Sequence, residues 1–514
     1  MTTAQNTLQE SREVVAPSEN EGGFFEKQIN IAAESSEISE TPYSIYNMRE
    51  KWLLVGLVAV AGLFSPLPAN IYFPAIPTLV NVFHQSTELL NVTVTVYLVM
   101  QGVSPMAWGP ISDQFGRRPT FLICLAILIL SCIGLALTPT NAFWLLMLLR
   151  CVQAAGCAST IALESGAGVI GDVFERAERG SYFAMFNLGP MLAPCIGPAI
   201  GGALSEHLGW RSIFWFLVIF AAACFVLILL FLPETLRALV GNGSVQPSAI
   251  YIPLVPFIGK GKRTTTSDLN KPRRPKFANP FLLFMHVDVA ITLLFTGIVY
   301  AVNYTITASM ASAFAATYPY LSETSLGLCY LSTGGGMLVG STITGKLLDR
   351  EYRLVKQKLM KDHIEVSNVD FPIEYARLRT MPIHLLVFCA SVFAWGWCLE
   401  KNVSIIAPLI FQVLLGYTSI SILNTTMTLM IDILPSHGSS ITACTNLIRC
   451  SLAAVLVSVI DRITRAMGFG WAYILLGGIC LALLPLMLLE IKIGPKHRRK
   501  RQRIEEKKLM DASE

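Results

Sequence analysis

Charged residues are scarce in this sequence. Asp, Glu, Lys and Arg make up 14% of its 514 residues, hydrophobic residues make up 53%, and the mean hydropathy is +0.56. Soluble domains average about 25% charged residues. The deficit excludes an ordinary soluble protein and indicates a chain that has the lipid bilayer as its main solvent.

Motifs of nucleotide-driven pumps and of zinc enzymes are also missing. The sequence has neither a G-x-x-x-x-G-K-[ST] loop nor an H-E-x-x-H pair, and no polar stretch is long enough for a catalytic domain. The Gly-rich run at 333–340 lies inside an apolar stretch, so small residues at a helix contact explain it better than a phosphate loop. We therefore expect no enzyme, no cofactor and no metal.

Paired cysteines and an apolar leader are absent as well. The twelve cysteines are scattered through apolar stretches without a C-x-x-C pair, which is typical of small buried side chains rather than of disulfides or metal ligands. The first fifty residues are polar and acidic and do not resemble a signal peptide. They predict a disordered cytoplasmic tail at 1–50.

Long apolar segments, by contrast, recur to the end of the chain. Hydropathy predicts twelve spans of helical length, at 52–75, 88–110, 119–138, 142–168, 180–204, 210–232, 288–312, 324–346, 382–400, 403–430, 438–461 and 469–490. We predict an all-α membrane protein with two pseudo-symmetric six-helix bundles. Its domains would be bundles at 51–232 and 280–491, a cytoplasmic central loop at 233–279 and a basic tail at 492–514.

Basic residues predict the orientation. One side carries Arg117, Arg118, Arg176, Arg179 and the runs at 260–276, 350–361 and 496–503. The loops of the other side carry little beyond Arg211, Lys401, Arg462 and Arg465. The positive-inside rule places both termini in the cytoplasm, and we expect the plasma membrane. Solvated charge facing lipid explains the basic runs better than contact with nucleic acid.

The two halves of the chain echo each other. GPISDQFGRR after the second span and GKLLDREYR after the eighth each place an Asp four residues after a Gly, at Asp113 and Asp349. Asp172 after the fourth span and Asp432 after the tenth lie 260 residues apart. Duplicated halves imply a binding site between them near the middle of the membrane, with access that alternates as the halves rock.

Several motifs occur in order at the expected helix ends. They are NIYFPAIP (70–77), GPISDQFGRRP (109–119), RCVQAAG (150–156), GPMLAPCIGPAIGG (189–202), GWRSIFWF (209–216) and LPET (232–235). Over residues 45–492 they resemble the Major Facilitator Superfamily, its drug:proton antiporter branch and, within that branch, the fungal quinidine-resistance type.

The resemblance implies a function. It suggests a monomer that exports a drug, toxin or secondary metabolite in exchange for protons. An exporter or importer of an organic acid or polyamine and a membrane sensor that binds without transporting remain alternatives.

The resemblance also implies a cytoplasmic latch. In the family, the aspartate at the position of Asp113 lies near the start of the eleventh helix, here around 435–439, and a carboxylate is favoured at a helix N-terminus. An arginine would join the latch to the end of the fourth span. The latch candidates are Asp113, Arg117, Arg118, Asp172 and Asp349. Charges that only fix the topology are the alternative.

The fourth span holds the candidates for proton coupling. One helix face carries Arg150, Gln153, Cys157, Thr160, Glu164 and Gly168. The resemblance implies that Arg150 takes part in coupling. A membrane-embedded carboxylate such as Glu164 can accept a proton near neutrality, although its place towards the cytoplasmic end also suits an interface residue. The two positions lie about 21 Å apart along an ideal helix, too far to pair directly.

Polar residues within other spans are candidates for lining a substrate cavity. They are Asn70, Tyr72, Gln101, Gln153, Asn303, Tyr304, Gln412, Asn446 and Arg449. Hydrogen bonds between neighbouring helices are the alternative for each.

The fifth span is unusually rich in glycine and proline. The residues concerned are Gly189, Pro190, Pro194, Gly197, Pro198, Gly201 and Gly202. Gly189, Gly197 and Gly201 share one helix face, and the prolines recur every four residues. We expect a bent, close-packed hinge surface between the halves, with an ordinary kinked helix as the alternative.

Overall fold

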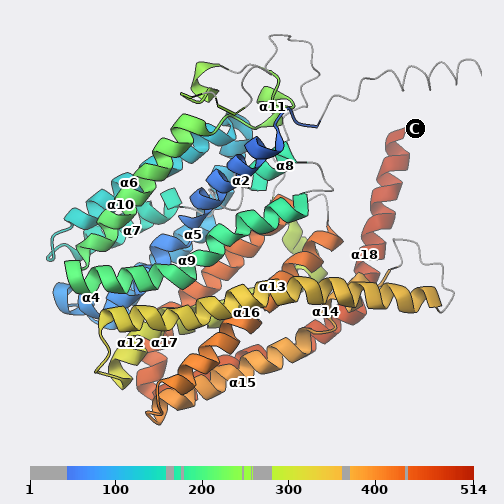
Figure 1. The fold of residues 1–514 in the computed structure, drawn as a ribbon. Helices are drawn as coiled ribbons and strands as arrows, with labels where there is room; N and C mark the ends of the chain where they lie inside the picture. Colours follow the sequence, from blue (N-terminus) through green and yellow to red (C-terminus); the bar gives the residue numbers. More distant parts are fainter. Residues whose placement is uncertain are drawn as a thin grey trace, which may run out of the picture. The chain divides into compact units, whose positions relative to one another are not determined.

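Apolar helices dominate the structure, a computed structural model that describes residues 43–157, 167–174, 179–245, 248–255, 257–258, 280–361, 371–434 and 438–513. Every regular element among these residues is a helix (Figure 1). Residues Ile45–Glu514 form one unit, separate from Met1–Ser44, and all the helices belong to it.

The first half contains six spans. The first consists of α2 (Met48–Leu63), α3 (Leu67–Asn70), η1 (Phe73–Ala75) and α4 (Ile76–Phe83). The others are formed by α5 (Thr87–Phe115), α6 (Arg117–Leu137), α7 (Phe143–Cys157) with α8 (Ala167–Val173), α9 (Arg179–Leu208) and α10 (Arg211–Phe231). The short helices α11 (Arg237–Val240) and η3 (Ala249–Tyr251) follow.

The second half repeats this layout. After η4 (Pro280–Met285) come α12 (Val287–Thr317), α13 (Glu323–Lys361), α14 (Ile373–Leu378), α15 (Met381–Glu400), α16 (Ile406–Ile433), α17 (Gly438–Ala482) and α18 (Leu484–Ser513).

These helices account for the twelve predicted spans in order. Ten segments of the described chain are long and apolar enough to cross a membrane, and α7 is a shorter apolar helix whose continuation at 158–166 lies outside the described residues. One of the ten, Ser440–Arg499, contains two spans, because Gly468 has a φ of 78° and interrupts α17. A left-handed φ of this kind suits glycine.

Prolines divide the first span into short pieces. α3, η1 and α4 each carry a proline in their first turn, where the missing N–H costs no helical hydrogen bond. Asn70 ends α3 and Tyr72 immediately precedes η1, so both lie at breaks in the span, and both are buried.

The C-terminal basic run is more structured than the sequence suggested. On α18, Arg498 is only 4% exposed and lies 3.1 Å from a Glu374 carboxylate oxygen, while Arg501 lies 2.6 Å from one of Asp288. The prediction that residues 496–503 are solvated, lipid-facing charge is therefore wrong for these two arginines. Buried carboxylates at the starts of α12 and α14 bind them instead.

The halves meet along two pairs of helices. α9 packs along α13, beside it in Figure 1, and α5 packs along α17. The fifth span thus meets the eighth, and the second meets the eleventh. In a duplicated chain the second span corresponds to the eighth and the fifth to the eleventh. The two helix pairs are therefore equivalent, and the interface has the expected pseudo-two-fold symmetry.

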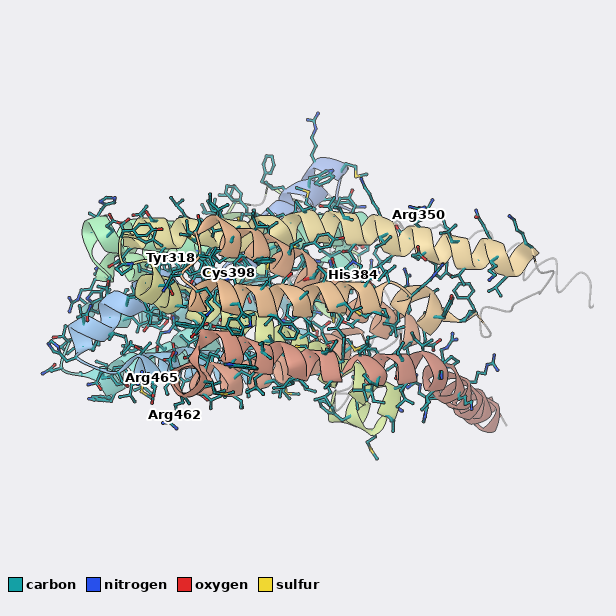
Figure 2. All side chains as sticks on the ribbon, turned by 90° about the horizontal axis from the view of Figure 1, so that it is seen from below. Tyr318, Arg350, His384, Cys398, Arg462 and Arg465 are labelled. Atoms are coloured by element: carbon teal, nitrogen blue, oxygen red, sulfur yellow. The ribbon has the colours of Figure 1, made fainter. Side chains whose placement is uncertain are left out.

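The helix ends form two sides. We call the side where α2 begins and α10 ends the tail end, and the side where α4 ends and α5 begins the far end. Figure 2 shows Arg462 and Arg465 at one end of the bundle. They precede the break of α17 at Gly468. Arg350, in the last third of α13, lies towards the other end.

Candidate functional site

A buried arginine organises the polar side chains of the first half. Arg150 on α7 is fully buried, and its NH1 donates hydrogen bonds to the Pro68 carbonyl at 3.1 Å and to Gln153 Oε1 at 2.6 Å. Its guanidinium carbon lies 4.3 Å from the ring centroid of Tyr72 and 4.4 Å from that of Tyr97. The cation is therefore held between two aromatic faces.

Arg150 has no anionic partner among the described residues. Its Nε and NH2 groups make no hydrogen bond there, and its hydrogen-bond acceptors are a carbonyl and an amide oxygen. Burying a charge without a counter-charge is costly. Within the described part of the first half, this positive charge is therefore uncompensated.

A second arginine occupies a similar environment in the other half. Arg449 on α17 donates from NH2 to Asn446 Oδ1 at 3.4 Å, and its guanidinium carbon lies 4.4 Å from the ring centroid of Tyr300. Its Nε is buried without a partner in the described part of the chain. Tyr300 in turn lies 5.7 Å, centroid to centroid, from Tyr304, whose hydroxyl is also unpartnered there.

A chain of contacts connects these arginines across the halves. Asn446 Nδ2 donates to the Gln101 carbonyl at 2.8 Å, and the Gln101 amide and the Tyr97 hydroxyl both approach the Ser65 carbonyl at 3.4 Å. Tyr304 extends the set beyond Tyr300, and its ring also lies 5.8 Å from that of Phe73 in the first half. We call this set the arginine cluster; its members are Arg150, Tyr72, Tyr97, Gln101, Tyr300, Tyr304, Asn446 and Arg449.

The structure brings most of the predicted cavity residues into or beside this cluster, but not all. Asn70 Nδ2 donates to the Pro66 carbonyl in its own turn, at 2.7 Å. Gln412 accepts from Thr333 Oγ1 at 2.8 Å, a contact between α16 and α13 of the same half. Asn303 is buried on α12 beside Tyr304. Contact of any of these side chains with substrate stays a prediction.

Sequence reasoning missed two tyrosines of the cluster. Tyr97 precedes Gln101 by four residues, and Tyr300 precedes Tyr304 by four. Since residues four apart lie on the same helix face, an aromatic residue one turn before each polar candidate was the available signal.

At the tail end, Arg117 joins three parts of the first half. Its NH1 lies 2.7 Å from Asp113 Oδ1, and its Nε lies 3.4 Å from Asp172 Oδ2. Burial raises the pKa of Asp172 to about 6, although Arg117 partly opposes this shift. Arg117, rather than Arg118, is thus the arginine that pairs with Asp172. Arg118 binds the carbonyls of Leu229 and Ile250.

Glu234, from the LPET motif, caps the start of α6. Its carboxylate accepts hydrogen bonds from the backbone N–H groups of Arg117 at 2.9 Å and Arg118 at 3.2 Å, and from those of Thr235 and Leu236. Such a cap satisfies the open N–H groups of a helix and its positive end. Burial raises the pKa of Glu234, and these four N–H groups oppose the rise.

The second half has a matching ion pair that sequence reasoning missed. Arg377 Nε lies 2.8 Å from Asp432 Oδ2, and its NH1 lies 3.5 Å from the Leu348 carbonyl. Asp349, the expected counterpart of Asp113, is exposed on α13, and its backbone carbonyl accepts from Arg353 at 3.2 Å. The Arg377 contact reaches the backbone beside Asp349 and not its carboxylate.

Polar contacts between the halves gather at the far end. Thr324 N donates to Glu206 at 2.8 Å, and Thr78 donates to Glu323. Asn91 also donates to Asp461 there at 2.9 Å, and Glu88 lies 3.3 Å from both Arg462 and Arg465. Further from this end, Thr95 donates to the Ala454 carbonyl at 3.4 Å and Asn446 to that of Gln101 at 2.8 Å. Within the described residues, the ion pairs of the tail end stay inside one half. This conformer is therefore closed at the far end.

The glycine face of α9 has a different neighbour from the one predicted. A Cβ at Gly189 would lie 2.0 Å from the Ala59 carbonyl, and one at Gly201 would lie 2.0 Å from that of Ile71. Gly197 also faces the first span. The prediction that this face lies between the halves is wrong, because it packs on the first span of its own half. Gly202 is the glycine that faces α13, where a Cβ would meet the Glu323 carbonyl.

Two predicted elements lie outside the described residues. Glu164 falls within 158–166, and the segment expected to meet Asp113 includes 435–437.

Pro190, Pro194 and Pro198 lie inside α9, which runs from Arg179 to Leu208.

Comparison with known proteins identifies relatives over most of the chain. The family model described as Major Facilitator Superfamily matches residues 58–458. Citrate exporter 1 of Aspergillus niger is 35% identical over 498 residues, covering 94% of this chain and 93% of the exporter. The MFS antiporter QDR2 of Candida albicans is 35% identical over 465 residues, with 88% and 90% covered.

A solved structure supports the same fold. A bacterial homologue of the human lysosomal transporter Spinster, in an inward-facing and unoccupied conformation, aligns with a TM-score of 0.54. The alignment covers 88% of this chain and 98% of that one at 13% sequence identity.

Proposed function

We propose that this chain, which belongs to the Major Facilitator Superfamily and is a secondary transporter that exports small organic molecules, drives that export by proton antiport. The observation that carries the alternating-access cycle of this proposal is the asymmetry of the polar contacts between the halves. They close the far end, whereas the tail-end ion pairs hold each half together internally. Two internally braced halves with a closure at one end suit alternating access by rocking.

The basic residues support an orientation for this cycle. By the positive-inside rule they favour a cytoplasmic tail end and an outer far end, and we propose the plasma membrane as the location. The conformer described above is then the inward-facing one, in which a monomer takes up its cargo from the cytosol or the inner leaflet. An outward-facing conformer requires the tail end to close and the contacts of Glu88, Glu206 and Glu323 to separate.

Closure of the tail end would use the latch. Asp113 is held by Arg117, which also binds Asp172, so a contact of Asp113 with the start of α17 would couple α5, α8 and α17. The positive end of the α17 dipole favours this carboxylate.

Proton coupling would use Arg150 and Glu164 on the fourth span. Coupling requires that proton and cargo bind the two conformers with different affinities. A proton that neutralises Glu164 would change the charge of the fourth span, in which Arg150 is a buried charge. Citrate exporter 1 and the antiporter QDR2 support export as the direction.

Transport by the purified full-length protein in liposomes tests this function. Citrate and the drug-like cation rhodamine 6G serve as probes, and a pH-sensitive dye reports the proton flux. We expect an imposed pH gradient to drive at least one probe against its concentration gradient. The substitution Glu164→Gln should abolish that accumulation while leaving downhill exchange. If a pH gradient drives neither probe, although both bind, the antiport proposal is wrong.

A further inference from the structure

The two arginines of the arginine cluster are its chemically most unusual feature. Arg150 belongs to the first half and Arg449 to the second, and each lies over a tyrosine ring at 4.3 to 4.4 Å. Each also has at least one buried guanidinium N–H group without a hydrogen-bond partner in the described part of the chain. Charges inside a membrane helix are costly and usually mark a functional partner.

Counter-charges within the described residues lie elsewhere. The described carboxylates with an ion pair are at the far end, at Glu88, or at the tail end, at Asp113, Asp172, Asp288, Glu351, Glu374 and Asp432. Glu164 lies outside the described residues. In the described part of the chain, Arg150 and Arg449 contact a carbonyl, amide oxygens and aromatic faces, and all of these are neutral.

We propose that Arg150 and Arg449 bind the cargo as an organic anion carrying one or more carboxylates, with one guanidinium contributed by each half. This assignment rests on the proposed transport function and specifies the class of its substrate. The ligand would supply the negative charge that the described residues do not provide.

The chemistry of the unpartnered groups fits a carboxylate. A guanidinium presents its N–H groups as a planar fork that matches two carboxylate oxygens, and such charge-assisted bonds are among the strongest in proteins. Nε and NH2 of Arg150 are the two open donors on one edge of its fork. The open hydroxyl of Tyr304, whose ring neighbours Tyr300, offers another donor in the cluster.

The position of the cluster connects recognition with the transport cycle. Asn446 of the second half bonds to the Gln101 backbone of the first, so the cluster lies where the halves touch. An anion that binds both arginines would draw the halves together, and its affinity would depend on their separation. A ligand shifts a conformational equilibrium only through such a difference in affinity. A lipophilic cation would instead be repelled by two positive charges.

Direct binding to the purified full-length protein tests the proposal. The probes are radiolabelled benzoate, succinate and citrate, with rhodamine 6G as the cationic comparison. We expect at least one carboxylate to bind, and Arg449→Gln to weaken that binding about tenfold or more, as loss of a charge-assisted bond implies. Arg449→Lys, which keeps the charge, should lose less, and the exposed Arg353→Gln on α13 should bind as the unmodified protein does.

The result that overturns the proposal is specific. Failure of all three carboxylates to bind while rhodamine 6G binds would refute an anionic cargo, as would unchanged carboxylate affinity in Arg449→Gln. Either outcome leaves the antiport proposal standing, because proton-driven movement of rhodamine 6G would still establish it. If Arg449→Gln does not fold, carboxylate binding by Arg449→Lys is compared with that of the unmodified protein. Weaker binding by Arg449→Lys would support a site that uses the guanidinium fork, and equal binding would refute it.

Discussion

The Arg377 Nε atom lies 2.8 Å from a carboxylate oxygen of Asp432. Arg117 and Asp172 form the equivalent pair at 3.4 Å, and each of these residues precedes its counterpart by 260 positions. The same ion pair thus braces the tail end of each half. Its conservation between the two halves of one chain is structural evidence for the duplication that the motifs suggested.

The pair in the first half should make stability depend on pH. The pKa of Asp172 is raised to about 6 in the folded protein, so the folded state binds a proton at a pH where the unfolded chain, with an ordinary aspartate, does not. Stability should therefore increase as the pH falls through 6. From about pH 7.5 to about pH 5 the gain is about 1 kcal/mol.

Melting temperatures in detergent across this range provide the measurement. Asp172→Asn carries no titrating group at this position, so the unmodified protein should gain stability relative to it as the pH falls. Parallel pH profiles of the two proteins would contradict the raised pKa.

The C-terminal helix should be needed for the stability of the second half. Arg498→Ala leaves Glu374 buried without its partner, which costs about 3–5 kcal/mol for a buried pair. We expect a melting temperature lower by several degrees, whereas Lys496→Ala, an exposed position on the same helix, should change it little. Equal effects of the two substitutions would show that α18 is not held by this ion pair.

The contact of α9 with the first span should tolerate no side chain. In Gly201→Ala the new Cβ would lie 2.0 Å from the Ile71 carbonyl, so the helices would have to separate. We expect lower stability and less folded protein in the membrane. Gly335→Ala, where no atom lies within 4 Å of the added Cβ, is the control and should behave as the unmodified protein or slightly better. Fluorescence-detected gel filtration measures both.

The far end should have to open during transport. A Thr78→Cys, Glu323→Cys double variant places two thiols where the halves are hydrogen bonded. Oxidative cross-linking should stop transport, and reduction should restore it, since rocking requires these positions to separate. Neither single variant should respond in this way. Transport that continues with the cross-link fully formed would refute opening at this end.

The predictability of the site differed from residue to residue. Arg150 and Arg449 were recognisable because a charge in an apolar span stands out against its neighbours. Tyr97 and Tyr300 were not, because an aromatic residue in a membrane helix is common and only its position over a guanidinium gives it meaning. Arg377 was hidden because a longer connection in the second half separates it from Asp349, whereas Arg117 follows Asp113 by one helical turn.

The sequence by itself determined the solvent, the number and order of the spans, the duplication and the family, because hydropathy, charge placement and short motifs are local properties of the chain. Only the tertiary structure decided which surfaces meet. It placed the glycine face of α9 on the first span, bound Arg498 to Glu374, and joined Arg150 to Arg449 through Tyr97, Gln101 and Asn446. A helix face predicts that something packs there, but the identity of the neighbour depends on how distant helices cross, which no local pattern records.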